Sequence, residues 1–292
     1  EQGNYKVTYV AGTLTITSKV IDKDGKNVEV NSPTDHEYDS KAHKWSPTVT
    51  DKKSKKKLEA GKDYEVSYDK DDFTNVGTIT VTITGKGNYS GTVTRSYKIT
   101  PKSVTVTADN KSKVFGETEP ELTAKVAGTL GNDTVEYTLS RKAGEDVGTY
   151  PITASGKAEQ GNYKVTYVAG TLTITSQSID PGTDPEKPNP DYTGAKVNSP
   201  KDSVYDGKEH KWSPTVTDKA DKKLEAVTDY TVEYSTSDFT NVTGTITVTI
   251  TGIGNYTGTV VRTYAITPAP LSITTDSANK VYDGNPLTAD GR

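Results

Sequence analysis

The sequence predicts an all-β protein made of tandem small antiparallel β-sandwich modules, immunoglobulin-like or MBG-like in pattern, in an elongated array. Three observations predict this class: alternating apolar and polar residues, turns rich in glycine and asparagine, and long internal repeats. Alternation with a period of two residues indicates a strand with one buried face, and helical periodicity is nearly absent. Strand signals about every 8 to 12 residues are typical of sandwiches.

The repeats define the modules. The segment EQGNYKVTYVAGTLTITS at residues 1–18 recurs unchanged at residues 159–176. A second, looser repeat relates residues 31–51 to residues 198–218 and continues through GTITVTITGKGNYSGTV and GTITVTITGIGNYTGTV. Repeats of this length exceed one supersecondary unit, so each period must hold whole domains.

We therefore divide the chain into consecutive parts. They are the tail of a B module (1–18), the first A module (19–101), the complete B module (102–176), a Pro-rich linker (177–194), the second A module (195–268) and the start of a further module (269–292). The prolines at 181, 185, 188 and 190 favour an extended linker. The two end parts lack module partners, so we expect them to be disordered or paired with neighbouring chains.

The clearest strands lie in the A modules. Residues 78–84 have the sequence TITVTIT, which places Ile79, Val81 and Ile83 on one face and threonines on the other. Residues 245–251 repeat this pattern, and residues 103–107 and 171–175 show shorter versions, as half-buried antiparallel strands require. Threonine counts as polar, but its β-branched side chain favours the pleated backbone. A hydrophobic content of only 31% is therefore compatible with folded sheets.

Composition excludes several classes of function. The chain has no Cys and no Met, so it offers neither a disulfide framework nor a thiolate metal site. Its charged residues are of both signs and give a mildly acidic net charge of −4, whereas a nucleic-acid partner requires a basic face. No apolar run approaches the roughly 18 residues of a membrane helix, so we expect no membrane insertion in this segment. Any export signal or wall anchor is expected outside it.

Trp45 and Trp212 are the candidate ligand contacts. Each lies in the sequence His-Lys-Trp-Ser-Pro. An exposed tryptophan can stack on a sugar ring, but a large apolar residue can equally pack against the sandwich. The strand-like segments that run from both tryptophans into Thr-Val-Thr favour the packing role.

No catalytic or metal-binding set of residues is evident. The histidines His36, His43 and His210 do not make a zinc set without cysteines. The acidic residues lie mainly in turns and linkers, and no nucleophile has an oriented base. We therefore predict no catalytic residue, no cofactor and no metal. Asn75 and Asn241 occupy equivalent predicted strands and are the candidates for a Lys–Asn isopeptide cross-link of the kind that surface domains sometimes carry.

The B module resembles a known family. The segments that carry the resemblance are KVFG at 113–116, LSR at 139–141, VGTY at 147–150, NY at 162–163 and GTLTI at 170–174. They are similar to the MBG repeats of large bacterial surface proteins, although Phe115 stands where that motif usually has Tyr. The sequence VYDG at 281–284 resembles the start of a related YDG or MBG repeat. The A modules look like bacterial immunoglobulin-like repeats.

The resemblance implies an adhesin-like protein on a bacterial surface, often Gram-positive and wall-anchored. The repeats would then form a monomeric stalk that presents a distant adhesive domain. The alternative is a module that binds mucin glycans or a host glycoprotein such as immunoglobulin, for which repeated weak sites would give avidity. An enzyme is the third hypothesis, and no set of residues supports it.

Overall fold

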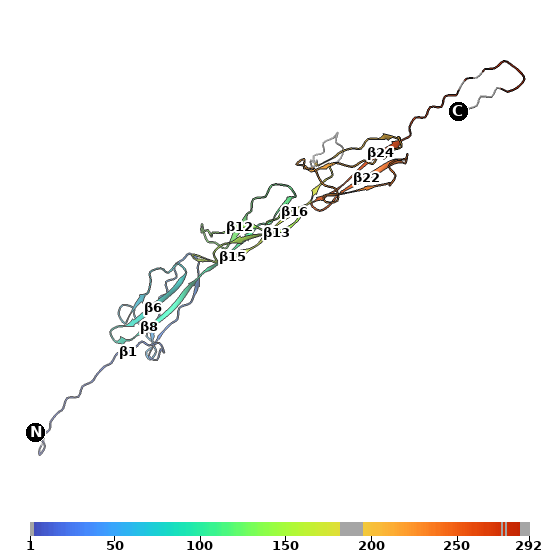
Figure 1. Ribbon diagram of the computed structural model, residues 1–292. Coiled ribbons are helices and arrows are strands. Elements are labelled where there is room, and N and C mark those ends of the chain that lie inside the picture. The colour runs from blue at the N-terminus through green and yellow to red at the C-terminus, as the bar shows by residue number, and fades with distance from the viewer. Residues whose placement is uncertain (1–2, 182–194, 276, 278, 287–292) are drawn as a thin grey trace. The chain divides into compact units, whose positions relative to one another are not determined.

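The computed structural model, drawn in Figure 1, describes residues 3–181, 195–275, 277 and 279–286. The chain divides into two compact units. Unit 1 comprises Glu1–Asn110, Glu121–Lys142 and Pro151–Thr171, and unit 2 comprises Lys111–Pro120, Ala143–Tyr150 and Leu172–Arg292. The elements of the described residues are all strands, so the all-β prediction is confirmed. Nowhere in these residues is a helix long and apolar enough to cross a membrane. The module boundaries stay predictions.

The first A module lies in unit 1, and its main sheet has the order β3-β8-β6-β5. The strands are β3 (His36–Glu37), β8 (Thr92–Thr100), β6 (Gly77–Gly85) and β5 (Tyr64–Tyr68). In β6, Ile79, Val81 and Ile83 are fully buried, as the alternation predicts. Two small sheets accompany it: β1 (Lys19–Val20) with β7 (Tyr89–Ser90), and β2 (Val28–Val30) with β4 (Val49–Asp51).

The second A module, in unit 2, repeats this arrangement strand for strand. Its main sheet is formed by β19 (Ser203–Val204), β24 (Thr259–Thr267), β22 (Gly244–Gly252) and β21 (Tyr230–Tyr234). The small sheets are β17 (Gln177–Ser178) with β23 (Tyr256–Thr257), and β18 (Lys196–Val197) with β20 (Val216–Thr217). Ile246, Val248 and Ile250 of β22 fill the core, as the repeat predicts.

The first residues of the predicted linker are part of this core. β17 pairs in parallel with β23, and Ile179 is fully buried in the core of the second A module. Residues 182–194 of the linker lie outside the described residues. In the first A module, Ile21 holds the place of Ile179, and a turn closed by the Gly25 N–H on the Asp22 carbonyl at 3.2 Å leads on to β2.

The B module combines parallel and antiparallel pairs. In unit 1, β11 (Ala124–Ala127), β9 (Lys102–Ala108), β15 (Tyr163–Val168) and β14 (Glu159–Gln160) form one sheet in that order. β12 (Thr138–Arg141) pairs with β13 (Gly148–Ser155), and in unit 2, β10 (Lys111–Val114) pairs with β16 (Gly170–Thr175).

The prediction of antiparallel strands at 103–107 and 171–175 is wrong in one respect. β9 pairs in parallel with β15, and β16 pairs in parallel with β10. Both pairs join strands that are far apart in the sequence, so the chain crosses over between them instead of turning back in a hairpin. Alternation fixes which face of a strand is buried, but it does not fix the direction of the neighbouring strand.

The identical 18-residue segments occupy two different environments. Leu172 and Ile174 of β16 are buried, whereas their counterparts Leu14 and Ile16 are both 89% exposed. The first strand of the described residues is β1, so this N-terminal copy precedes every strand. Identical sequence therefore leads to a buried strand only where partner strands are present.

Candidate functional site

Trp45 and Trp212 are half-buried and are held in the same way. The Trp45 N–H donates to Tyr97 Oη at 3.3 Å, and Tyr68 Oη donates to the Trp45 carbonyl at 2.8 Å. In the second A module, the Trp212 N–H donates to Tyr264 Oη at 3.3 Å, and Tyr234 Oη donates to the Trp212 carbonyl at 2.7 Å. Each tryptophan backbone is thus fixed by two tyrosine hydroxyls.

The lysine before each tryptophan covers an aromatic pair. Lys44 Nζ lies 4.6 Å from the ring centre of Tyr68 and 5.0 Å from that of Phe73. Lys211 repeats this contact in the second A module. Cation–π contacts of this kind are worth about 0.5–1 kcal/mol at exposed sites. Trp212 packs against the hydrophobic core, and the role of both tryptophans as ligand contacts stays a prediction.

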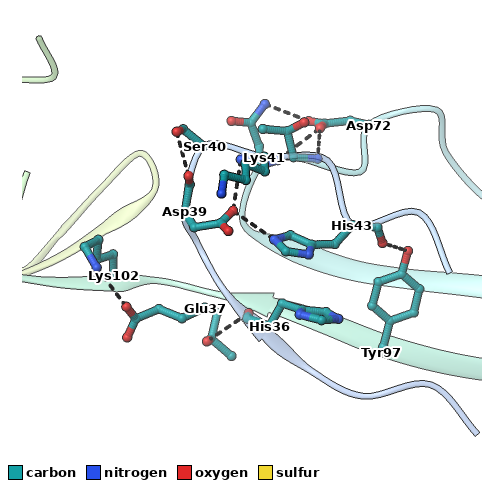
Figure 2. Close-up of polar contacts among 12 residues, drawn as sticks. His36, Glu37, Asp39, Ser40, Lys41, His43, Asp72, Tyr97 and Lys102 are labelled. Atoms are coloured by element: carbon teal, nitrogen blue, oxygen red, sulfur yellow. Dashed lines mark hydrogen bonds and ion pairs between the residues drawn. The ribbon is translucent and has the colours of Figure 1, made fainter. Parts of the chain in front are cut away.

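A loop that follows β3 brings together the histidines of the first A module (Figure 2). Asp39 Oδ1 lies 2.8 Å from His43 Nε2 and accepts the Lys41 N–H at 2.9 Å. The Lys41 N–H, and then His43, hold the pKa of Asp39 below its usual value of 3.8. The His36 ring stacks on His43 at 4.1 Å, and Tyr97 Oη donates to the His43 carbonyl at 2.6 Å.

The second A module has the same Asp206–His210 contact at 2.8 Å, with Ser203 in place of His36. The Asp–His contact recurs in both copies, and in each it joins two residues four positions apart in the same loop. Among the described residues, no group of three or more His, Asp or Glu side chains is placed to hold a metal ion.

The first A module and the B module contact each other within unit 1. We name this contact the first joint, and it includes Tyr38 at the start of the loop described above. The Asn162 side chain forms its centre: Oδ1 accepts the Val76 N–H at 2.8 Å, and Nδ2 donates to Asn75 Oδ1 at 2.7 Å. Asn75 Nδ2 in turn donates to Asp72 Oδ2 at 2.8 Å.

Asp72 shapes the turn that presents Asn75. Its Oδ1 accepts the backbone N–H groups of Thr74 at 2.9 Å and Asn75 at 3.0 Å, and these bonds hold the pKa of Asp72 below its usual range. The structure places Asn75 in the loop between β5 and β6, so its assignment to a strand was wrong. Its amide hydrogen-bonds to Asn162 and Asp72, and the isopeptide cross-link stays a prediction.

Aromatic and charged groups complete the first joint. Tyr38 and Tyr163 pack edge to face at 5.6 Å, and both are buried. Tyr163 Oη donates to Asp133 Oδ2 at 2.6 Å, and burial, followed by this bond, raises the pKa of Tyr163. Lys102 Nζ lies 3.0 Å from Glu37 Oε1, as Figure 2 shows.

The second joint, in unit 2, links the B module to the second A module in the same manner. Asn255 Oδ1 accepts the Val147 N–H at 2.8 Å, and Asn255 Nδ2 donates to Asp146 Oδ1 at 2.8 Å. Phe115 packs edge to face on Tyr256 at 5.5 Å. The substitution of Phe for the usual Tyr of the motif is therefore compatible with the packing role.

Charge also contributes to the second joint. Lys219 Nζ lies 2.7 Å from Glu117 Oε1 and is the main reason that the pKa of Glu117 falls below its usual range. Tyr256 Oη lies 3.4 Å from Asp218 Oδ2. Burial, and then the charge of Asp218, raise the pKa of Tyr256 to about 12.

The two joints share one design. In each joint, the asparagine of a Gly-Asn-Tyr sequence bonds to two consecutive residues. Its Oδ1 accepts from the backbone N–H of a valine, and its Nδ2 donates to the side chain of the residue that precedes this valine. The dipeptides are Asn75-Val76 and Asp146-Val147. Sequence reasoning missed this site, because it treated the Gly-Asn-Tyr residues only as turns and family markers. Their recurrence at 3–5, 87–89, 161–163 and 254–256 was the available signal.

Unit 1 also has an open groove of about 570 Å³ on the B module. Gln160 Nε2 lies at its edge and donates to the Glu136 carbonyl at 2.8 Å and to Tyr167 Oη at 3.0 Å. The groove is lined by Val135, Glu136, Tyr137, Thr138, Ser155, Gly156, Lys157 and Gln160. An aromatic ring beside amide and carboxylate groups has the composition of a site for a polar ligand.

Comparisons with known proteins identify one region. No curated protein sequence matches the chain. Solved structures with similarity include Protocadherin Gamma B2 extracellular cadherin domains 3-6, at 10% identity over 84% of this chain and 76% of that chain, with a TM-score of 0.25. Drosophila N-cadherin EC1-4 shows 11% identity over 84% and 76%, with a TM-score of 0.24, and mouse Cadherin-23 EC22-24 shows 12% over 83% and 99%, with a TM-score of 0.22. At these values the fold assignment rests on the strands themselves.

The family comparison is more specific. Residues 104–173 match the model of the MBG domain (YGX type), which is a non-catalytic type of domain typical of extracellular surface proteins. The matched residues lie within the predicted B module and include most of β9 and all of β15. Over this region the chain is similar to the MBG domain of bacterial surface proteins, which confirms the resemblance that the sequence predicts.

Proposed function

We propose that this chain is a non-enzymatic repeat segment of a bacterial surface adhesin and acts as a stalk that presents a distant adhesive region. The observation that supports this most directly is the shared design of the two joints. Modules that were only tethered would need no matched asparagine contacts. We place the protein on the cell surface of a Gram-positive bacterium, anchored to the wall through a region outside this segment.

The physical basis is the loss of rotational freedom at each joint. Only Pro101 separates β8 from β9, and only Ser176 separates β16 from β17. Domains joined by small polar interfaces are expected to move relative to one another. Here each joint adds two asparagine hydrogen bonds, an aromatic pair and an ion pair to a one-residue connection. Each hydrogen bond contributes about 0.5–1.5 kcal/mol.

The test is a distance distribution across one joint, measured by pulsed electron resonance. The chain has no cysteine, so Lys70→Cys and Lys157→Cys give two unique spin-label positions, one on each side of the first joint. A narrow distribution is expected, with broadening in Asn162→Ala. Asn88→Ala is the matched control, since Asn88 belongs to a Gly-Asn-Tyr sequence outside both joints. A distribution that is already broad in the parent chain contradicts a stiff stalk.

The second candidate is direct binding of mucin glycans or of a host glycoprotein such as immunoglobulin. The groove beside Tyr137 and Gln160 favours it, because it joins an aromatic ring to amide and carboxylate groups. A glycan array and a pulldown from mucus and serum test it. Binding that Tyr137→Ala removes and Trp212→Ala leaves unchanged supports the groove, and the reverse result supports the predicted tryptophan contact. If neither assay retains a ligand, the stalk is the proposed function that remains.

A further inference from the structure

We propose that Lys19 and Asp51 form an intramolecular isopeptide cross-link, a covalent amide between the lysine amine and the aspartate carboxyl. Lys19 Nζ is paired directly with Asp51 Oδ2, and the Asp51 side chain is only 2% exposed. The protein thus holds an amine against a buried acid, and such positioning is what makes an intramolecular reaction fast. This pair is distinct from Asn75 and Asn241, and the cross-link does not depend on the proposed stalk function.

Two short strands place the reacting side chains. Lys19 lies in β1, which pairs in parallel with β7 so that Lys19 is opposite Tyr89. The Ile21 N–H then donates to the Ser90 carbonyl at 2.7 Å, which fixes the chain beyond β1. Asp51 is the last residue of β4, which pairs with β2. The strand pairing therefore sets the amine and the carboxyl against each other.

The second oxygen of the carboxyl is bonded as an oxyanion site requires. Asp51 Oδ1 accepts the backbone N–H groups of Lys53 and Ser54, both at 3.0 Å. When an amine attacks the carboxyl carbon, negative charge develops on this oxygen, and two preorganised N–H donors stabilise that charge. The oxygen of the product amide can keep the same two bonds.

Tyr89 is placed to relay a proton. Its Oη lies 3.3 Å from Asp51 Oδ2, the oxygen that leaves in the reaction. Burial, followed by the charge of Asp51, raises the pKa of Tyr89, so the phenol keeps a proton that it can donate. The bond from Lys19 is the main reason that the pKa of Asp51 lies below its usual range. The pair consequently starts as an ammonium and a carboxylate.

The condensation balances within these groups. One proton passes from Lys19 Nζ to Asp51 Oδ2, which gives a neutral amine beside a carboxylic acid. The amine lone pair then forms the Nζ–Cγ bond, and Oδ1 takes the negative charge. A second proton passes from Nζ through Tyr89 Oη to Oδ2 as the Cγ–Oδ2 bond breaks, which is general acid–base catalysis by a positioned phenol. The products are one amide and one water molecule.

The second A module has the same carboxyl site without the amine. Asp218 Oδ1 accepts two backbone N–H groups of the loop that follows it, both at 2.9 Å, and Tyr256 Oη lies 3.4 Å from Asp218 Oδ2. β17 places Gln177 opposite Tyr256, at the position that Lys19 holds in β1. A glutamine side chain has no amine, so the second A module is an internal control that cannot form this cross-link.

The cross-link would change how the first A module responds to force. A pull on the two ends of the module passes through the amide and bypasses residues 20–50. This segment therefore stays unextended when the module unfolds. At the length of an extended residue, the unfolding step becomes about 100 Å shorter than in a module without the cross-link.

Mass spectrometry of the full chain tests the cross-link directly. The parent chain should weigh less than its sequence by one water molecule. Trypsin should release a branched peptide in which residues 7–23 are joined to residues 45–52, because the modified Lys19 is no longer cleaved. Lys19→Gln, which copies the second A module, should have its full sequence mass. A parent chain at full mass, or a loss of water that persists in Lys19→Gln, overturns the proposal.

Single-molecule pulling gives a readout that an ion pair does not move. The first A module of the parent chain should unfold with a step about 100 Å shorter than that of the same module in Lys19→Gln. The second A module should give the same step in both chains, which controls for handling and calibration. Equal steps of the first A module in the two chains contradict the cross-link.

Discussion

At the scale of single residues, asparagine is the side chain that joins the modules. Its amide offers a donor and an acceptor side by side, so it can span a backbone N–H and a side-chain oxygen at once. Aspartate has no donor and leucine has neither group. The choice of Asn162 and Asn255 therefore follows from the two polar groups that face each of them.

The first prediction uses the difference between the two joints. Asn255→Asp sets a carboxylate against Asp146, whereas Asn162→Asp sets one against the neutral Asn75. We expect Asn255→Asp to loosen the second joint more than Asn162→Asp loosens the first. Spin-label distances across each joint measure the effect, and equal broadening at neutral pH contradicts the role of Asp146.

The second prediction concerns alkaline stability. Tyr256 has a pKa of about 12 in the folded chain against about 10 in the unfolded chain. The folded state keeps this proton between pH 10 and pH 12 while the unfolded state loses it, so the free energy of unfolding falls as the pH rises through this window. In Tyr256→Phe, the free energy of unfolding should therefore fall less steeply over this pH window. Urea unfolding of unit 2 at several pH values measures the slope, and an unchanged slope contradicts the assignment.

At the scale of elements, the long strands are where the sequence is most informative. Alternation predicts β6 and β22 with their buried faces, because one side of each strand is isoleucine and valine and the other is threonine. The two-residue strands β1 and β7 carry too few residues to show any period. The parallel pairs were missed because a strand's partner depends on where the chain crosses over, which no local pattern records.

The third prediction compares the same change in both A modules. Ile83→Ala and Ile250→Ala each remove a fully buried side chain from equivalent strands. Each should cost about 2–5 kcal/mol of unfolding free energy, from lost burial and the cavity left behind. Thermal unfolding followed by hydrogen exchange assigns each loss to its own module. Thr82→Ala, on the opposite face of β6, should change stability by no more than about 1 kcal/mol.

At the scale of the whole molecule, alternation, turns and internal repeats predicted the all-β class, and the motifs of the B module predicted the MBG-like region. None of these patterns identified the joints. The tryptophans drew attention because large aromatic residues are conspicuous in a sequence. The joint asparagines lie in turns, where asparagine is common for backbone reasons alone. Their role depends on residues 86 or more positions away along the chain, as in the bond between Asn162 and Val76. It can therefore be recognised only once the fold is known.

The fourth prediction uses the identical segments. Deletion of residues 1–16 should leave the unfolding temperatures of the modules unchanged, because Leu14 and Ile16 face solvent. Deletion of residues 159–174, which have the same sequence, should unfold the B module, because it removes the buried Leu172 and Ile174 with β15 and most of β16. Calorimetry of both deletions measures this. A loss of stability in the first deletion would show that residues 3–16 pack on their own chain.

The parallel pairing of β10 with β16 has a mechanical consequence. β10 lies near the start of the B module and β16 at its end, so a pull on the chain draws the two strands in opposite directions along their length. All the hydrogen bonds between them are then loaded together instead of breaking one at a time. A surface protein held at one end and dragged by flowing fluid at the other experiences this kind of force. We expect single-molecule pulling to find the B module yielding at higher force through its two ends than through Thr138 and Ser155, which lie opposite each other in an antiparallel pair.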